Sequence, residues 1–506
     1  MRTKKIFLNM LCDIIPYLLI GIVGLVKVNF LIKYIGDVGN GYYQTINQII
    51  TYVFLAQIGF GDAVIFSLYK VFAKEDKKKI NEIYSGSRVI FRKIGFVILG
   101  IIGLVSLILY LFYGFEDGYR NSSLICFIVI SCSYLISYFG KGQTYLSILS
   151  ASQNKYIYSL VSNNIRLLCD ILIIFVTYKY KSLESIAIVI LIAKILEEII
   201  LRIVMNKKYP WLREVKRENT KMFKMTKDLA GIQIGRIILN NTDSIILMAF
   251  LGPVSVSIYT SYMFVTRFLN EISTKIELAV VNSFGNVFAN KENDKVYPLF
   301  KELLILFIVI SFSMTITFIL GIRGFINLWI GKENYLLNYH TVVLFGICSF
   351  LYCIGLPLLS LVNAHGYFKD NKKHTFICAF VNIIMSLVLV KFYKLDGLLI
   401  GTSLAYLLNI IMKIGLVNKK IFKGINSRIY LYYGLIILSL VGICLFIKNI
   451  EVVLFGVMTS IPIVVVILFV IFISLMLFIF GIFNTFSKSS RDLYDRGKLL
   501  LKTKKN

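Results

Sequence analysis

The feature that most constrains this chain is a series of uncharged apolar runs, each long enough to cross a lipid bilayer. Residues 94–112, 303–320, 342–362 and 430–447 contain no Asp, Glu, Lys or Arg. At ~1.5 Å per residue, runs of about 18 to 21 residues match the hydrocarbon core of a membrane. A mean hydropathy of +0.78 with 58% hydrophobic residues lies outside the range of soluble domains. The sequence therefore predicts an all-α, polytopic membrane protein.

Fourteen spans are expected, and the distribution of basic residues gives their orientation. The spans lie near 12–34, 43–68, 94–113, 123–140, 158–177, 184–204, 229–251, 255–278, 302–321, 341–362, 375–392, 396–416, 429–447 and 453–482. With the N-terminus inside, forty of the 55 basic residues fall in cytoplasmic segments and nine in external ones. The positive-inside rule then predicts that both termini are cytoplasmic. The net charge of +28 follows from this pattern and does not indicate nucleic-acid binding.

An internal repeat predicts how the spans are grouped. Residues 34–43 match 250–259 at an offset of 216, and 149–154 weakly match 362–366. Because six spans separate the copies, both have the same orientation in the membrane. We expect two six-helix lobes related as parallel repeats, and two further helices after them. The predicted segments are lobes 1–204 and 229–416, a basic linker 205–228, helices in 429–482 and a basic tail 483–506.

Three short motifs give the sequence a family resemblance. They are Tyr34-Ile-Gly-Asp-Val-Gly-Asn-Gly-Tyr-Tyr43, Leu55-Ala-Gln-Ile-Gly-Phe-Gly-Asp62 and Asn240-Asn-Thr-Asp243, the last followed by Phe250-Leu-Gly252. With the span number and the repeat, the chain resembles the Wzx-type polysaccharide flippases of the multidrug/oligosaccharidyl-lipid/polysaccharide exporter (MOP) superfamily. The resemblance implies a MATE-like fold in the bacterial cytoplasmic (inner) membrane.

The same resemblance implies a substrate and a mechanism. The substrate would be an undecaprenyl-pyrophosphate-linked oligosaccharide, moved from the inner to the outer leaflet for O-antigen or capsule synthesis. Transport would proceed by alternating access coupled to a proton or sodium gradient, and other polysaccharide-assembly proteins are possible partners.

Charged and polar residues inside the spans predict where such a substrate would bind. Arg236, Asn240 and Asp243 are spaced i, i+4, i+7 and share one helical face, and Arg267 and Glu271 are spaced by four. A charge in hydrocarbon costs on the order of 3 kcal/mol, so such faces normally turn toward a protein or water-lined interior. In the resembled fold this helix pair lines the central cavity.

Roles follow for these residues. Arg236, Arg267 and Asn240 are the candidates for substrate binding, because guanidinium groups suit phosphate. Lys27 either joins them or reaches the external interface. Asp243 and Glu271 are candidates for an ion-coupling or cavity acid. Two further combinations, Arg166 with Asp170 and Lys194 with Glu198, are spaced by four and indicate structural charge pairs.

Several function classes are disfavoured, and two alternatives stay open. The sequence shows neither a nucleotide-binding glycine loop nor a nucleophile with its base, so we expect no enzyme and no cofactor. His340, His365 and His374 lack metal-ligand spacing, so no metal site is expected. A MATE-type exporter of cationic drugs would favour unpaired acids in the cavity. A membrane-embedded polysaccharide polymerase would need a larger external loop.

Overall fold

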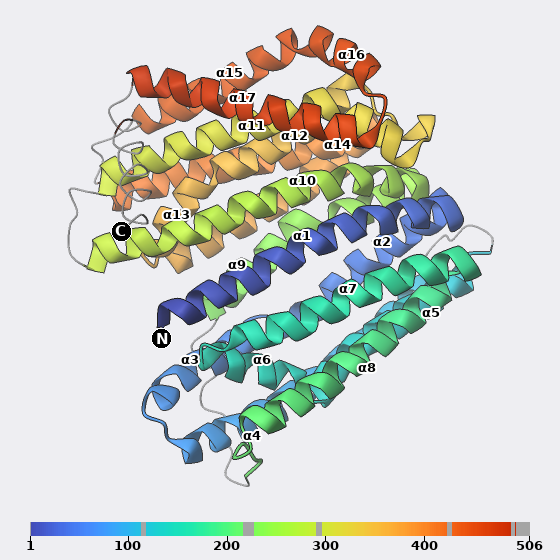
Figure 1. Cartoon of the computed structure of the whole chain (residues 1–506), viewed down its shortest axis with the longest axis vertical. Coiled ribbons are helices and arrows are strands. Elements are labelled where there is room, and N and C mark those ends of the chain that lie inside the picture. The colour runs from blue at the N-terminus through green and yellow to red at the C-terminus, as the bar shows by residue number, and fades with distance from the viewer. Residues whose placement is uncertain are drawn as a thin grey trace. The chain divides into compact units, whose positions relative to one another are not determined.

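All described elements of the chain are helices (Figure 1). The computed structural model describes the backbone of residues 2–112, 118–215, 227–289, 296–422, 428–486 and 491. The helices are α1 (Arg2–Tyr34), α2 (Gly36–Val53), η1 (Phe54–Gln57), α3 (Phe60–Ala73), α4 (Lys77–Phe112), α5 (Arg120–Phe139), α6 (Gly142–Ala151), α7 (Lys155–Tyr180), α8 (Leu183–Lys208), α9 (Lys227–Asn241), α10 (Asp243–Ala289), α11 (Val296–Ile330), η4 (Glu333–Tyr335), α12 (Tyr339–Ile354), α13 (Leu356–Ala364), α14 (Phe368–Lys420), α15 (Arg428–Phe446), α16 (Lys448–Val457) and α17 (Ile461–Phe486). Much of the predicted linker 205–228 and most of the predicted tail 483–506 lie outside the described residues.

Within this described part, nine helical stretches are long and apolar enough to cross a membrane. Two of them, residues 231–278 and 368–420, each contain two predicted spans. The three remaining predicted spans correspond to α1, to α2 with α3, and to α8. The predicted all-α, multi-pass architecture is therefore confirmed.

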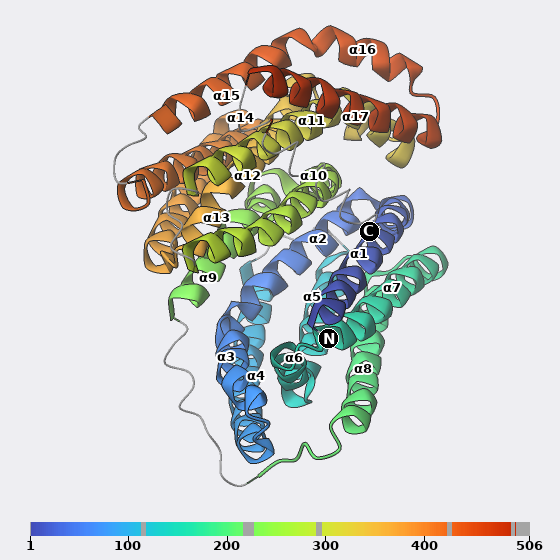
Figure 2. The ribbon, with the colours of Figure 1, turned by 60° about the vertical axis from the view of Figure 1, so that its left-hand side comes forward.

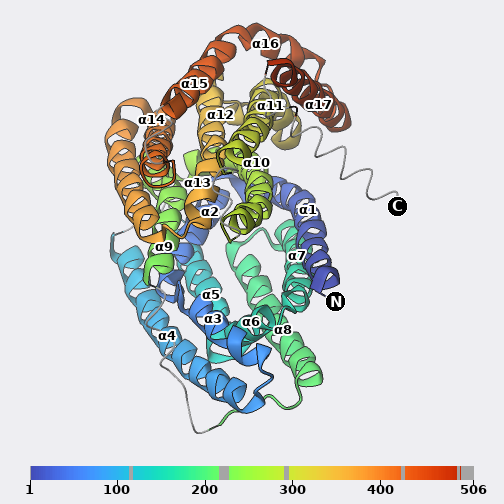
Figure 3. The same cartoon turned by 90° about the vertical axis from the view of Figure 1, so that its left-hand side faces the viewer.

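Internal contacts divide the chain into two compact units, Met1–Ser257 and Ile258–Asn506. In the first unit α1 runs beside α7, and α5 runs beside α8 (Figure 2). In the second unit α11 packs against α12 and α17 (Figure 3). The boundary falls inside α10, so α9 and the start of α10 belong to the first unit. The predicted lobes 1–204 and 229–416 stay a prediction.

The predicted repeat has a counterpart in the backbone. Left-handed residues occur at the same place in both copies, at offsets of 216 and then 213. These are Gly36 (φ 88°) with Gly252 (φ 77°), Gln153 (φ 59°) with Gly366 (φ 72°), and Lys181 (φ 51°) with Lys394 (φ 50°). Such values are uncommon for residues other than glycine. Corresponding helices of the two copies thus end or bend at matched positions.

The second span is discontinuous, which corrects the continuous helix expected over 43–68. After α2 the chain forms the single turn η1, passes through extended Ile58 and left-handed Gly59, and then continues as α3. Glycine adopts φ 87° at position 59 without the steric penalty of a Cβ atom. Hydropathy registers only apolar length and does not report such a break.

Within the first unit, α2 and the start of α10 approach each other closely. A Cβ atom on Gly41 would overlap the backbone carbonyl of Pro253, so only glycine fits. Beside it the fully buried Asn40 donates from Nδ2 to Ser257 Oγ at 2.7 Å. Small residues commonly allow this kind of contact between membrane helices.

Candidate functional site

The first unit contains a cavity of about 380 Å³ whose lining is polar and uncharged. Amides and a hydroxyl come from Asn47 and Thr51 of α2, Gln57 of η1 and Gln143 of α6. Aromatic rings of Phe54, Tyr134 and Tyr138 line it together with Ser137. Three isoleucines, Ile50, Ile58 and Ile237, complete the wall. A volume of this size lies within the ~300–1,000 Å³ typical of small-molecule pockets.

Breaks in three spans surround this cavity. The turn η1 and Ile58 line it directly, and Gln143 lies just after the α5–α6 break at Gly140 and Lys141. Ile237 precedes the α9–α10 break, where Tyr52 and Thr242 share a hydrogen bond of 2.6 Å between their hydroxyl oxygens. Interrupted helices in membrane proteins are tolerated where they are buried or line a cavity, and in transporters they mark binding sites.

Part of the polar lining is already hydrogen-bonded. Asn47 Nδ2 donates to the Tyr43 carbonyl at 2.8 Å, and Gln143 Nε2 donates to Ser137 Oγ at 3.3 Å. The Tyr138 side chain is only 2% exposed, and its hydroxyl has no hydrogen-bond partner among the described residues. A buried hydroxyl left unsatisfied is unfavourable for stability.

Helices next to the cavity carry two lysine–carboxylate ion pairs. Lys27 Nζ on α1 lies 2.5 Å from Asp170 Oδ1 on α7, and the two side chains are 18% and 7% exposed. On α8, Lys194 Nζ lies 2.7 Å from Glu197 Oε2 and 5.1 Å from the centre of the Tyr134 ring. Lys194 thus places a neutralised cation against an aromatic wall of the cavity.

These contacts rearrange the charge pairs expected from sequence. The structure pairs Asp170 with Lys27, whereas the side chain of Arg166 is exposed one turn earlier on α7. Lys194 pairs with Glu197 and not with Glu198. The reason is geometric, because α7 turns Asp170 toward α1, and Glu198 points to the α5–α6 break. There Glu198 accepts hydrogen bonds from the backbone N–H groups of Lys141 at 2.6 Å and Gly142 at 3.0 Å.

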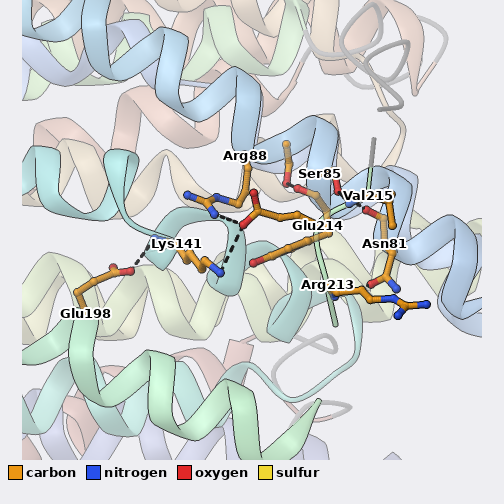
Figure 4. Close-up of polar contacts among 10 residues, drawn as sticks. Asn81, Ser85, Arg88, Lys141, Glu198, Arg213, Glu214 and Val215 are labelled. Atoms are coloured by element: carbon orange, nitrogen blue, oxygen red, sulfur yellow. Dashed lines mark hydrogen bonds and ion pairs between the residues drawn. The ribbon is translucent and has the colours of Figure 1, made fainter. Parts of the chain in front are cut away.

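A segment after α8, residues 209–215, ties the α5–α6 break to α4 (Figure 4). Its backbone bonds Asn81 and Ser85, with Arg213 N donating to Asn81 Oδ1 at 3.1 Å and Val215 N donating to Ser85 Oγ at 2.8 Å. Glu214 forms ion pairs with Arg88 of α4 and, at 3.5 Å, with Lys141. Burial raises the pKa of the Glu214 carboxyl, but Arg88 and Lys141 outweigh it and lower the pKa overall, so the carboxylate stays charged at neutral pH.

The other predicted site residues divide between the two units. In the first unit Arg236 is half-buried on α9, and Asp243 is buried at the start of α10. The backbone of Asn240 belongs to α9, but its side chain lies outside the described residues. In the second unit Arg267 and Glu271 are exposed on α10. Their shared role in a central chamber stays a prediction. Among the described residues, no three His, Cys, Asp or Glu side chains form a group that could hold a metal ion.

The sequence analysis did not identify the cavity residues. An available signal was the density of amides and hydroxyls in an otherwise apolar second span, where Asn47, Thr51 and Gln57 follow one another at short intervals. Spans normally avoid such groups unless they bond each other or line a polar space.

Comparison with solved structures identifies the fold. The lipid II flippase MurJ in an inward closed conformation superposes with a TM-score of 0.67 at 16% identity, covering 93% of this chain and 98% of MurJ. An inward-facing multidrug resistance MATE family transporter of the MOP superfamily gives 0.64 at 13% identity, with coverages of 83% and 98%. A MOP superfamily transporter from Pyrococcus furiosus, described as having a binding pocket of reversed polarity, gives 0.57 at 12% identity, with coverages of 82% and 95%. This chain therefore has the MATE-like fold of MOP transporters.

Sequence comparisons add nothing to this fold assignment. No protein-family model matches the chain. No curated protein matches it either.

Proposed function

We propose that this protein is a flippase for polyprenyl-pyrophosphate-linked oligosaccharides. It moves the lipid-linked repeat unit of a surface polysaccharide, such as O-antigen or capsule, from the inner to the outer leaflet of the bacterial cytoplasmic membrane. Alternating access moves the substrate without covalent chemistry. The fold shared with a lipid II flippase supports this proposal, and the ion pairs of the first unit favour it over drug export.

The observation that carries the proposal is the state of the charges in the first unit. The carboxylates of Asp170 and Glu197 are each neutralised by a lysine, and Glu198 is bonded to backbone N–H groups. In contrast, no described carboxylate lies within ion-pair distance of the exposed Arg166 or the half-buried Arg236. A carrier of cationic drugs needs accessible acids. Available guanidinium groups beside neutralised acids favour an anionic headgroup.

Deletion of the gene in its bacterial host is expected to abolish surface polysaccharide and to leave lipid-linked repeat units on the cytoplasmic side of the membrane. Expression of the wild-type chain should restore the surface glycan. The measurement is surface polysaccharide by immunoblot, together with protection of lipid-linked sugars in sealed vesicles. If the deleted strain keeps normal surface glycan and instead becomes sensitive to cationic drugs, the drug-exporter alternative is correct.

Asp243 is the candidate for the coupling group, because it is buried at the start of α10. The break at Thr242 separates it from α9, which carries Arg236, and so interrupts the helical face expected from sequence. Asp243→Asn is expected to remove the dependence of transport on an ion gradient and to lower export about tenfold. Transport in vesicles with imposed proton or sodium gradients measures this effect. The coupling role of Asp243 is lost if the variant responds to both gradients as the wild type does.

A further inference from the structure

We propose that the cavity of the first unit, defined by Asn47, Thr51, Gln57, Tyr134, Ser137 and Tyr138, is a binding subsite for a neutral saccharide. The inference rests on the proposed function and deepens it, because it assigns the uncharged sugars of the substrate to a specific place. The pyrophosphate would be held by arginine elsewhere. The cavity has room for a small saccharide and not for a whole lipid-linked repeat unit.

The chemistry of the lining matches a sugar ring. Hydroxyl groups of a sugar both donate and accept, as do the amides of Asn47, Gln57 and Gln143 and the hydroxyl of Thr51. The less polar C–H face of a ring packs against aromatic side chains, and Phe54 forms a ring cluster with Tyr134 at 5.6 Å and Tyr138 at 5.9 Å between centroids. None of the described side chains in the lining is charged, so the cavity offers no counter-ion to a phosphate.

Tyr138 contributes its ring to this aromatic wall, and its side chain is 2% exposed. Its hydroxyl oxygen is itself buried and has no hydrogen-bond partner among the described residues, so the ring and not the hydroxyl is what Tyr138 presents to the cavity. The position beside η1 adds the second argument, since a break in a span that also lines a cavity is typical of a substrate site in transporters.

The second copy of the repeat carries different side chains at the positions of Phe54 and Ile58. At the offset of 216, Phe54 and Ile58 correspond to Asn270 and Thr274 of α10. These residues bond to the neighbouring α12, with Ser349 Oγ donating to Asn270 Oδ1 at 2.6 Å and Thr274 Oγ1 lying 2.9 Å from the Tyr352 hydroxyl. At these positions the second copy thus has polar groups that bond a neighbouring helix, whereas the first copy has an aromatic ring and an isoleucine that line the cavity.

The depth of the cavity fits loading from the cytoplasm. Gln57 follows the external turn at Gly36 by about 20 residues, or about 30 Å of helix. On the predicted orientation, Gln57 lies near the middle of the span 43–68, and Ser137 and Tyr138 lie near the cytoplasmic end of the span 123–140. Glu198 fixes the neighbouring α5–α6 break, and residues 209–215 fasten that break to α4, so one wall is held rigidly.

The test is binding of free sugars to the full-length protein in nanodiscs by saturation-transfer NMR. The probes are methyl β-D-glucoside, methyl β-D-galactoside and N-acetylglucosamine, with glucuronate as the charged counterpart. We expect at least one neutral probe to bind. Gln57→Ala and Thr51→Val should each weaken it, by about tenfold for the amide and severalfold for the hydroxyl. Ser137→Phe, which fills the cavity, should abolish binding. Gln233→Ala, on an exposed position of α9 outside the cavity, is the matched control and should bind normally.

Each outcome decides the proposal. Loss of binding in the cavity variants but not in Gln233→Ala supports the subsite. Equal binding by all variants, preference for glucuronate, or no binding of any neutral probe by the wild type overturns it. Because the host deletion is scored separately, the two proposals fail independently. If the protein binds sugar but its deletion leaves surface glycan intact, the flippase proposal is refuted. If deletion abolishes surface glycan but no neutral sugar binds, only the saccharide subsite is refuted.

Discussion

Lys27→Met and Asp170→Asn should each lower the free energy of unfolding by about 3–5 kcal/mol, because each leaves the other member of a buried ion pair without its counter-charge. The pair joins α1 to α7 across 143 residues of sequence, so its loss also weakens the contact between these helices. The double variant Lys27→Met/Asp170→Leu removes both charges and is expected to recover most of the stability. Reversible denaturation in mixed micelles measures all three.

Arg166→Met is the matched control for this experiment. Arg166 lies one turn before Asp170 on the same helix and its side chain is exposed, so removal of this cation should change stability by no more than about 0.5 kcal/mol. The importance of the Lys27–Asp170 pair is refuted if the single variants unfold like the wild type. It is equally refuted if Arg166→Met is as damaging as they are.

Arg236→Ala should reduce export of the lipid-linked glycan by about ten- to a hundredfold, which corresponds to one lost hydrogen bond to a charged group. Arg236 is half-buried on α9, and no described carboxylate lies within ion-pair distance of it, so the guanidinium is available to a pyrophosphate. Arg236→Lys should retain part of the activity, because it keeps the charge but loses the planar, bidentate geometry. Surface polysaccharide in the complemented deletion strain is the measurement, normalised to the amount of protein in the membrane.

Arg92→Ala provides the comparison for Arg236, because Arg92 is an exposed arginine of α4 that lies near the cytoplasmic basic segments. It should export normally. Normal export by Arg236→Ala at equal membrane levels would remove Arg236 from substrate binding, whatever the fate of the flippase proposal.

The helical type of the spans could be predicted because long apolar runs in a membrane form helices. Runs such as residues 303–320 have no soluble alternative, and α11 covers that run as expected. The break at Ile58 and Gly59 could not be predicted in the same way. Hydropathy averages over the break, and whether a glycine interrupts a span depends on what packs beside it.

Charge partners could be proposed only where they were close in sequence. Spacing of four suggested Arg166 with Asp170, but a tertiary contact with α1 supplies Lys27 instead. In the same way Glu198 bonds the backbone of a distant turn and not Lys194. Helical periodicity places charges on a face, and only packing decides which neighbour that face meets.

The complete lining of the cavity could be predicted from local sequence even less well than the charge pairs. Asn47 of α2, Tyr138 of α5 and Gln143 of α6 come together where interrupted helices pack beside one another. The amides and hydroxyls of the second span indicate that it meets a polar space. Which residues of other helices complete that space depends on packing, so the sequence does not identify them.

The left-handed residues shared by the two copies record the ancestry of the chain. Gln153 and Gly366, like Lys181 and Lys394, keep a positive φ angle although the surrounding side chains have diverged. A duplicated segment in a bilayer can exchange one apolar residue for another. It cannot shift a helix end or bend without changing the direction of the helix that follows. In such proteins the positions of helix ends and bends therefore stay similar after the side-chain sequences have diverged.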